Sequence, residues 1–252
     1  MNNAQNVPAQ EHGAAQASNV RAGLLTAGEL ETYHRNGFVV PQFRLAGEEV
    51  ARLRDLMFRL VADNPALADK MMNLPHIPGA GSQGLRSSPG WMDFAAHPVI
   101  VDMVGQIVGP DIILRGSAAF YKRAGNGPAT PWHRDSATLP IKPLVAMSVW
   151  IAVSDATVAN ACLRFIPGSH LNQSRGVHRQ DTRAGVTFGL TLDESEYDES
   201  TAVDVKIEAG QNGDLRCVRD SRLPTQSGNA RARRLCRAVH AGNEPVRARC
   251  AG

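Results

Sequence analysis

The order in which helix-like and strand-like segments follow one another limits the fold of this chain more than any other feature of its sequence. Segments with helical spacing of apolar residues come first, and short strand-like segments bounded by Gly, Pro, Asn or Asp begin at about residue 111. The strand-like segments are DIILRGSAAFYKRA, LVAMSVWIAVSDA, CLRFIPGS and DVKIEAGQ. Helices followed by strands predict an α+β chain with a β-sandwich or barrel at its core.

Three segments before residue 111 are predicted to be helices. The first starts with Thr26 and Glu29 in capping-box spacing and ends at Gly37, before a strand that begins at Phe38. The second and third are GEEVARLRDLMFRLVADNP and HPVIVDMVGQIVGP, which carry apolar residues along one face. Between them, residues 71–90 are rich in Gly, Pro and Ser and predict a long loop of the kind that often covers a site.

The distribution of charge divides the chain near residue 212. Residues 212–252 hold nine of the 27 Lys and Arg residues, all of them Arg, but only three of the 24 acidic residues, and they contain no Phe, Tyr, Trp or Ile. Residues 1–22 are rich in Ala, Gln and Asn, which is typical of a flexible leader. We therefore expect a leader (1–22), a globular domain (23–211) and a poorly ordered Arg-rich tail (212–252).

The sequence carries no recognisable signal for export or membrane insertion. The leader lacks the basic and apolar segments of a secretory signal, and no apolar run approaches the roughly 18 residues that a membrane helix requires. The proportions of hydrophobic residues (43%) and charged residues (20%) are those of an ordinary globular protein. We expect a cytoplasmic protein with no membrane partner.

His133 and Asp135, in the segment PATPWHRDSATLP, are candidate metal ligands. Residues two apart on an extended strand point to the same side, so an imidazole and a carboxylate at this spacing can bind one ion. Non-haem Fe(II) and Zn²⁺ both suit such ligands, and a catalytic site for either metal uses a further protein ligand. The tripeptide alone is a weak signal, because most H-x-D triplets are coincidental surface residues.

Four segments in a fixed order resemble the phytanoyl-CoA dioxygenase family. They are HRNGFVVPQF, AFYKRAGNGPATPWHRDS, VAMSVWIAVSDATVANACLRFIPGSH and IEAGQ, and the resemblance covers about residues 25–211. It implies an Fe(II)- and 2-oxoglutarate-dependent dioxygenase that uses molecular oxygen to hydroxylate a small-molecule substrate. It also implies a double-stranded β-helix, or jelly roll, with N-terminal helices packed against it. Ala161 departs from the family, which usually has Gly there.

The resemblance also implies roles for four residues. His133 and Asp135 correspond to the first two metal ligands, and the retained Asp135 favours hydroxylation because halogenating relatives carry Ala at this position. Trp150 matches a position that lines the 2-oxoglutarate pocket, and Lys122 lies on the strand before the metal pair, where it could face a carboxylate of the cofactor. The alternative interpretation is a core tryptophan and a solvated lysine.

The third metal ligand of the family has no counterpart in this sequence. The family supplies a distal His after AGQ in a pattern like H-x-S-x-x-N, and an Arg about ten residues later binds the far carboxylate of 2-oxoglutarate through its planar guanidinium. Here the similarity ends at Gln211. His170 belongs to a PGSH turn that is structural in the family, His178 falls in a predicted loop and His240 lies in the tail. We expect none of these three to complete the site.

A shifted reading frame would explain the tail. Moving the frame forward by one nucleotide allows NGDLR to become Met-Val-Ile-Phe-Ala, which is typical of the family after AGQ. The codons of Ser221 and Arg222 then permit a His, and those through Gln226 permit Ala-Ser-Pro-Pro-Asn, which together give H-x-S-x-x-N. Arginines are permitted about nine to eleven residues later, which is close to where the family places its 2-oxoglutarate-binding Arg. Our hypothesis is that residues 212–252 are a frameshifted version of an ordinary oxygenase C-terminus.

This hypothesis predicts that the chain lacks the distal His, the cofactor-binding Arg and at least one core strand, and that it binds iron weakly. Two alternatives remain. One is a non-catalytic jelly-roll protein that binds a ligand without turnover. The other is a nucleic-acid-associated protein, because Arg-rich segments bind phosphate backbones. The tail has no aromatic residues for base stacking, so a nucleic-acid partner is the less favoured alternative.

Overall fold

The computed structural model describes most of the chain between residues 24 and 241. The described ranges are 24–81, 83–122, 128–139, 145–172, 174–187, 189–216, 220–223 and 232–241, with only the backbone described at 138, 214–216, 220–223 and 232–241. The predicted leader (1–22) lies outside the described residues, as do 217–219, 224–231 and 242–252 of the predicted tail.

The helices lie mainly in the first half of the chain, as the sequence predicts. They are α1 (Ala27–Asn36), α2 (Gly47–Asp63), α3 (Met92–Ala95) and α4 (Pro98–Val108). Short 3-10 helices cover Pro65–Leu67, Pro89–Trp91, Asp135–Thr138, Val158–Asn160, Ser169–Leu171, Glu194–Glu196 and Glu199–Thr201. The ends of α1 confirm the capping prediction: Thr26 and Glu29 form a capping box, and Gly37 adopts the left-handed conformation (φ 81°). No described helix is long and apolar enough to cross a membrane.

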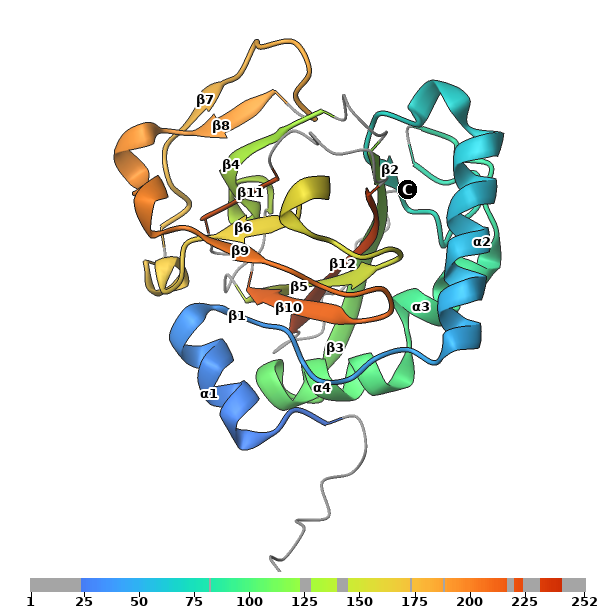
Figure 1. Ribbon diagram of the computed structural model, residues 1–252, viewed down its shortest axis with the longest axis horizontal. Helices are drawn as coiled ribbons and strands as arrows, with labels where there is room; N and C mark the ends of the chain where they lie inside the picture. The colour runs from blue at the N-terminus through green and yellow to red at the C-terminus, as the bar shows by residue number, and fades with distance from the viewer. Residues whose placement is uncertain are drawn as a thin grey trace, which may run out of the picture.

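Twelve strands are described, and they form three antiparallel sheets (Figure 1). The six-stranded sheet has the order β1-β10-β5-β12-β3-β2, the four-stranded sheet β4-β11-β6-β9, and β7 and β8 form a hairpin. The strands are β1 (Phe38–Val39), β2 (Met72–Asn73), β3 (Ile112–Lys122), β4 (Thr130–Arg134), β5 (Ala146–Ala152), β6 (Leu163–Phe165), β7 (His178–Gln180), β8 (Leu190–Leu192), β9 (Val203–Val205), β10 (Asn212–Arg216), β11 (Asp220–Leu223) and β12 (Ala232–Ala241).

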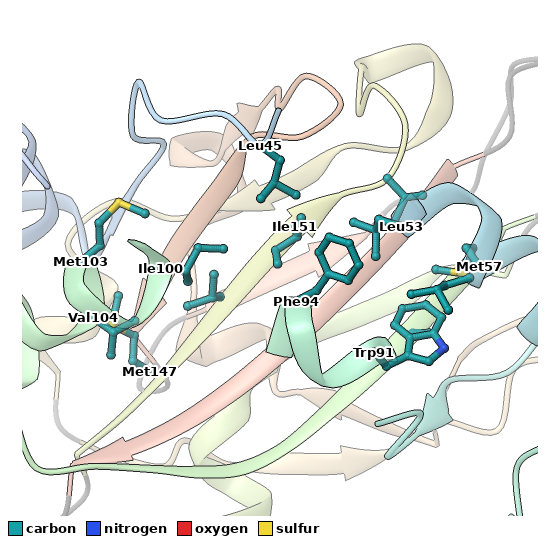
Figure 2. Packing of buried hydrophobic residues seen from close by; sticks show 14 of the residues in the cluster. Leu45, Leu53, Met57, Trp91, Phe94, Ile100, Met103, Val104, Met147 and Ile151 are labelled. Carbon is teal, nitrogen blue, oxygen red and sulfur yellow. The ribbon is translucent and has the colours of Figure 1, made fainter. Parts of the chain in front are cut away.

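The strand β5 runs through the middle of the six-stranded sheet and is buried on both faces. Met147, Val149 and Ile151 point to the helices, where they join a core that contains Trp91 and Phe94 (Figure 2). The alternate residues of β5 point to the four-stranded sheet, and two of them share a second apolar cluster with β6 and β9. All seven residues of β5 are buried. The predicted α+β arrangement, with helices covering one side of a β-core, is confirmed.

Residues 212–241 differ from the poorly ordered tail that we expected. Their described backbone forms β10, β11 and β12, and β12 pairs with β3 along its whole length and with β5 from Arg234 to His240. The physical reason is that an antiparallel ladder is made by backbone N–H and C=O groups, which every residue except Pro supplies. Without β12, the facing edges of β3 and β5 would leave two rows of these groups unpaired. The backbone pairing therefore continues well past residue 211.

Candidate metal site

His133, on β4, and Asp135, which begins the 3-10 helix directly after β4, lie on the side that is directed toward the six-stranded sheet. Alternation along the strand directs Thr130, Trp132 and Arg134 the other way, toward the β7–β8 hairpin that lies beside β4 (Figure 1). His133 Nε2 lies 3.3 Å from Asp135 Oδ1. Two donors on adjacent positions of an octahedral ion with bonds of roughly 2.1 Å are about 3 Å apart. The predicted pair thus fits two adjacent ligand positions of one metal ion.

The orientation of His133 directs its Nε2 atom toward Asp135. Its Nδ1 lies 2.9 Å from the carbonyl oxygen of Pro131. A carbonyl oxygen only accepts hydrogen bonds, so Nδ1 must carry the proton and donate it. The neutral imidazole then has its lone pair on Nε2, the atom that faces Asp135. A backbone acceptor on the other ring nitrogen is the usual arrangement for a metal-binding histidine.

Asp135 is held from the opposite sheet. Ser148, on β5, donates a hydrogen bond from Oγ to Asp135 Oδ2 over 3.2 Å, which leaves Oδ1 directed to His133. The side chains of His133 and Asp135 are 18% and 35% exposed, so both ligand groups are accessible to an ion from solution. Sequence reasoning missed Ser148, although its position two residues before Trp150 on a strand is a signal that could have found it.

A third protein ligand is not found in the described part of the chain. No group of three His, Cys, Asp or Glu side chains that could hold a metal occurs among the described residues. His170 Nε2 instead lies 3.0 Å from the carbonyl oxygen of His34, at the end of α1. His178 Nε2 accepts a hydrogen bond from the backbone N–H of Arg134, on the outward side of β4. Of His240, on β12, only the backbone is described.

The strand that runs beside the metal pair is β11. Ser221 is the register partner of His133 on β4 and also of Phe165 on β6. Directly paired residues of antiparallel strands place their side chains on the same face of the sheet. Position 221 is therefore on the face that carries His133 and Asp135, and the sequence supplies a serine there.

Lys122 and Trp150 both lie on the inward face of the six-stranded sheet. Lys122 ends β3 and is buried, so it is not the solvated lysine of our alternative interpretation. Trp150 is also buried, and its ring stacks on that of Phe120 with centroids 5.0 Å apart. The shared face follows from register, because Cys236 of β12 is the partner of both Ala118 and Trp150. A role for either side chain in 2-oxoglutarate binding stays a prediction.

A cavity of about 630 Å³ lies on the other side of β4. Its walls include Trp132 and Tyr197, whose rings are 5.2 Å apart, together with Arg179 and Arg183 from the β7–β8 hairpin. The cavity therefore opens on the outward face of the strand and does not include His133 or Asp135. No sequence pattern predicted this cavity.

Comparison with known proteins agrees with these observations. The family description "Phytanoyl-CoA dioxygenase (PhyH)" matches residues 33–212, well over half of the chain. An ectoine dioxygenase of Nocardia farcinica is 29% identical over 59% of this chain and 52% of its own length. A phytanoyl-CoA dioxygenase domain-containing protein 1 homolog of Caenorhabditis elegans is 36% identical over 37% of this chain and 34% of its own length. The chain thus spans about half, or less, of these relatives.

Solved structures give the same result for the fold. The non-heme monooxygenase ThoJ is 25% identical, with a TM-score of 0.65 over 84% of this chain and 76% of its own. EvdO2 from Micromonospora carbonacea var. aurantiaca, complexed with 2-oxoglutarate, is 17% identical and shares the fold, with a TM-score of 0.70 over 86% of this chain and 91% of its own. Because the family match covers most of the chain and the H-x-D pair lies where two ligands of one ion would lie, we conclude that the chain belongs to the phytanoyl-CoA dioxygenase family.

Proposed function

We propose that the chain is built as an Fe(II)- and 2-oxoglutarate-dependent dioxygenase that hydroxylates a small organic substrate. The observation that carries the proposal is the 3.3 Å approach of His133 Nε2 to Asp135 Oδ1, with the remaining ring nitrogen bonded to a backbone carbonyl. Membership of the phytanoyl-CoA dioxygenase family supports it, as does the structural similarity to EvdO2, a protein solved with 2-oxoglutarate. We also propose that the two larger sheets form the jelly roll of that family.

His133 and Asp135 would hold the iron, and the six-stranded sheet would form the wall of the cofactor pocket. Bound iron with 2-oxoglutarate would supply the oxidising chemistry, in which one oxygen atom of O2 enters the substrate, the other enters succinate, and CO2 is released. The stacked ring of Trp150 gives this wall a rigid apolar surface that excludes water. Lys122, buried at the end of β3, would offer a positive charge to a carboxylate of 2-oxoglutarate.

We further propose that this chain is impaired in iron binding and turnover. Two protein donors hold a metal less firmly than three, and the described residues include no third donor beside His133 and Asp135. The register partner of His133 on β11 is Ser221, whose hydroxyl is a poor ligand compared with an imidazole. The backbone of β11 is paired with β4 as a regular strand. We therefore expect the defect to be a missing metal ligand and a missing cofactor contact, and not a missing strand at this place.

The two alternatives are less well supported. Three tail arginines, Arg233, Arg234 and Arg237, belong to β12, which is paired on both sides within a sheet, and such a strand is unlike an exposed basic arm. A binding protein without turnover keeps the same fold, and only an assay separates it from an impaired enzyme. We expect the substrate of this protein to be a small molecule, and we expect the protein to use molecular oxygen as its second substrate.

The test is an assay of 2-oxoglutarate decarboxylation with the full chain. Purified protein, Fe(II), 2-oxoglutarate and O2 are expected to give slow succinate release, and a version whose last 41 residues are translated from the shifted frame is expected to be much faster. Succinate release at a normal enzymatic rate by the chain as it stands would refute the impairment. Absence of any release in both versions, with iron bound, would support the binding protein instead.

A further inference from the structure

A hydrogen bond from Ser148, on β5, to Asp135, directly after β4, links the two large sheets at the proposed metal site. We propose that Ser148 is a positioning residue that holds Asp135 as a ligand through a single oxygen, Oδ1. The inference rests on the proposed metal site and goes beyond it, because it assigns a task to a residue that does not itself contact the ion.

The two oxygens of Asp135 have different neighbours. Oδ1 lies 3.3 Å from His133 Nε2, whereas Oδ2 accepts a hydrogen bond from Ser148 Oγ over 3.2 Å. A carboxylate can bind one ion through one oxygen or through both. The hydrogen bond engages Oδ2 and fixes the plane of the carboxylate, so Oδ1 alone is directed to the ion. A carboxylate held in this way occupies one position of the ion and leaves the neighbouring position to a small-molecule ligand.

Ser148 places a polar hydroxyl group in a strand that is buried along its whole length. It is the only polar residue in β5, whose seven residues are all buried, and buried strands of this kind are usually apolar throughout. A buried hydroxyl without a partner is destabilising, so a serine is tolerated at this place because its hydroxyl is hydrogen-bonded. The strand is fixed by pairing on both sides, with Leu215 of β10 and Ala238 of β12 opposite Ser148. The hydroxyl is therefore delivered to Asp135 by a rigid element.

A second buried serine in the same sheet provides a matched control. Ser117, on β3, is as buried as Ser148 and lies 2.6 Å from Nδ1 of His76. It belongs to the opposite face of the sheet, because Ser117 and the core residue Ala119 alternate with Phe120, which stacks on Trp150. Removing the Ser117 hydroxyl breaks a buried hydrogen bond in this sheet without touching Asp135.

The experiment is a titration of the full chain with Co(II) alone, followed by visible absorption. Co(II) reports both affinity and ligand geometry, so substrate and cofactor are not required. We expect Ser148→Ala to weaken Co(II) binding by about tenfold and to change the shape of the absorption band, since partners of ligating carboxylates are worth roughly 10–100-fold in metal affinity. Ser148→Thr should retain the affinity and band of the native chain, and Ser117→Ala should leave both unchanged.

Equal affinity and an equal band in the native chain and in Ser148→Ala would overturn the proposal. Equal weakening by Ser148→Ala and Ser117→Ala would also overturn it, because the effect would then be a general loss of stability. If Ser148→Ala does not fold, Ser148→Thr and Ser148→Val are compared, which have the same shape and differ by the hydroxyl alone. A native chain that binds no Co(II) would refute the proposed metal site itself, which is a different result from equal binding by all variants.

Discussion

The neighbouring strands β4 and β11 belong to the same sheet, but the sequence supplies them with different residues beside the proposed metal site. On β4, Arg134 is buried beside Ser174 and Glu196 on the outward side. On the inward side, His133 lies 3.3 Å from Asp135, the residue that follows the strand, and the two form the proposed ligand pair. What is described of β11 is its backbone, which pairs with β4 and β6. The comparison shows that two strands can be paired in register while the chemistry at the paired positions depends on which side chain the sequence supplies: His133 on β4 and Ser221 on β11.

The strongest test of this contrast is to place a histidine on β11 at residue 221, the register partner of His133. In Ser221→His, the imidazole would come from the residue directly opposite His133 and complete a two-His-one-carboxylate set. We expect Co(II) and Fe(II) to bind on the order of 100-fold more tightly, since even partners outside the ligand shell are worth 10–100-fold. The measurement is the metal dissociation constant of each full-length variant.

Arg222→His is the matched control for this gain. Residue 222 is the register partner of Arg164, which is bonded to Glu199, and the neighbouring position on a strand faces the other side of the sheet. This variant should bind metal no better than the native chain. If both substitutions increased the metal affinity similarly, the added imidazoles would bind the metal regardless of which face of β11 they occupy. Position 221 would then not be the one that completes the site beside His133.

The reading-frame hypothesis selects the same position independently. The shifted codons that permit a His are those of Ser221 and Arg222, and the pairing of β11 places residue 221 opposite His133. We expect the coding DNA of an independent preparation to contain one nucleotide fewer near codon 212. An unchanged sequence there would show that the tail is genuine, and the gain of metal binding in Ser221→His would then be a new property of the chain.

A comparison of two histidines tests whether the inward face of β4 alone binds the metal. His133→Ala should abolish the remaining Co(II) binding, because a single carboxylate is left. His178→Ala should retain it, since His178 only accepts a hydrogen bond from the backbone of Arg134, at a cost of about 0.5–1.5 kcal/mol in stability. Loss of Co(II) binding in both variants, with the fold intact by circular dichroism, would contradict this assignment of faces.

Two glycines test whether side-chain packing fixes β4 from outside. Both Gly176 and Gly185 have positive φ, but a methyl group at 176 would lie 3.0 Å from Nη1 of Arg134 and 2.6 Å from Leu192, whereas nothing lies within 4 Å at 185. Gly185→Ala should cost about 1–2 kcal/mol for the left-handed backbone. Gly176→Ala should cost about 1–3 kcal/mol more for overpacking, measured by urea denaturation. Equal losses of unfolding free energy in the two variants would mean that the Arg134 side chain moves away from an added methyl group at no measurable cost.

The same contrast explains how much could be predicted from sequence. The capping box of α1 was predicted correctly, and so was the proximity of His133 to Asp135, because both depend on side-chain types at short, fixed spacing. That the two side chains bind a metal stays a prediction. The strands β10 to β12 were missed because their sequence lacks alternation and aromatic residues. Their pairing partners include β3 and β5, which are distant in sequence, so no local pattern indicated the pairing. Ser148 was missed for a related reason: its contact with Asp135 joins two sheets and is not a local pattern.

A smaller effect is expected at the far edge of the six-stranded sheet, where side-chain and backbone contacts act together. The strand β2 pairs with β3 at only two positions, and beyond them the N–H of Leu74 donates to the carbonyl of Ser117 over 2.8 Å while His76 Nδ1 lies 2.6 Å from the Ser117 hydroxyl. Burial lowers the pKa of His76 below its ordinary value of 6.5. The unfolded or opened segment therefore binds a proton more readily than the folded one, so this contact contributes its full stability above about pH 6.5 and loses it as the pH falls below that value.

Hydrogen exchange at the Leu74 amide measures this effect directly. Its protection relative to the intrinsic rate should decrease between about pH 8 and about pH 5, the interval in which an ordinary histidine titrates. In His76→Gln the protection should be independent of pH over that interval, because the titrating group is gone. Protection that decreases equally in the native chain and in His76→Gln would assign the acid sensitivity to another group.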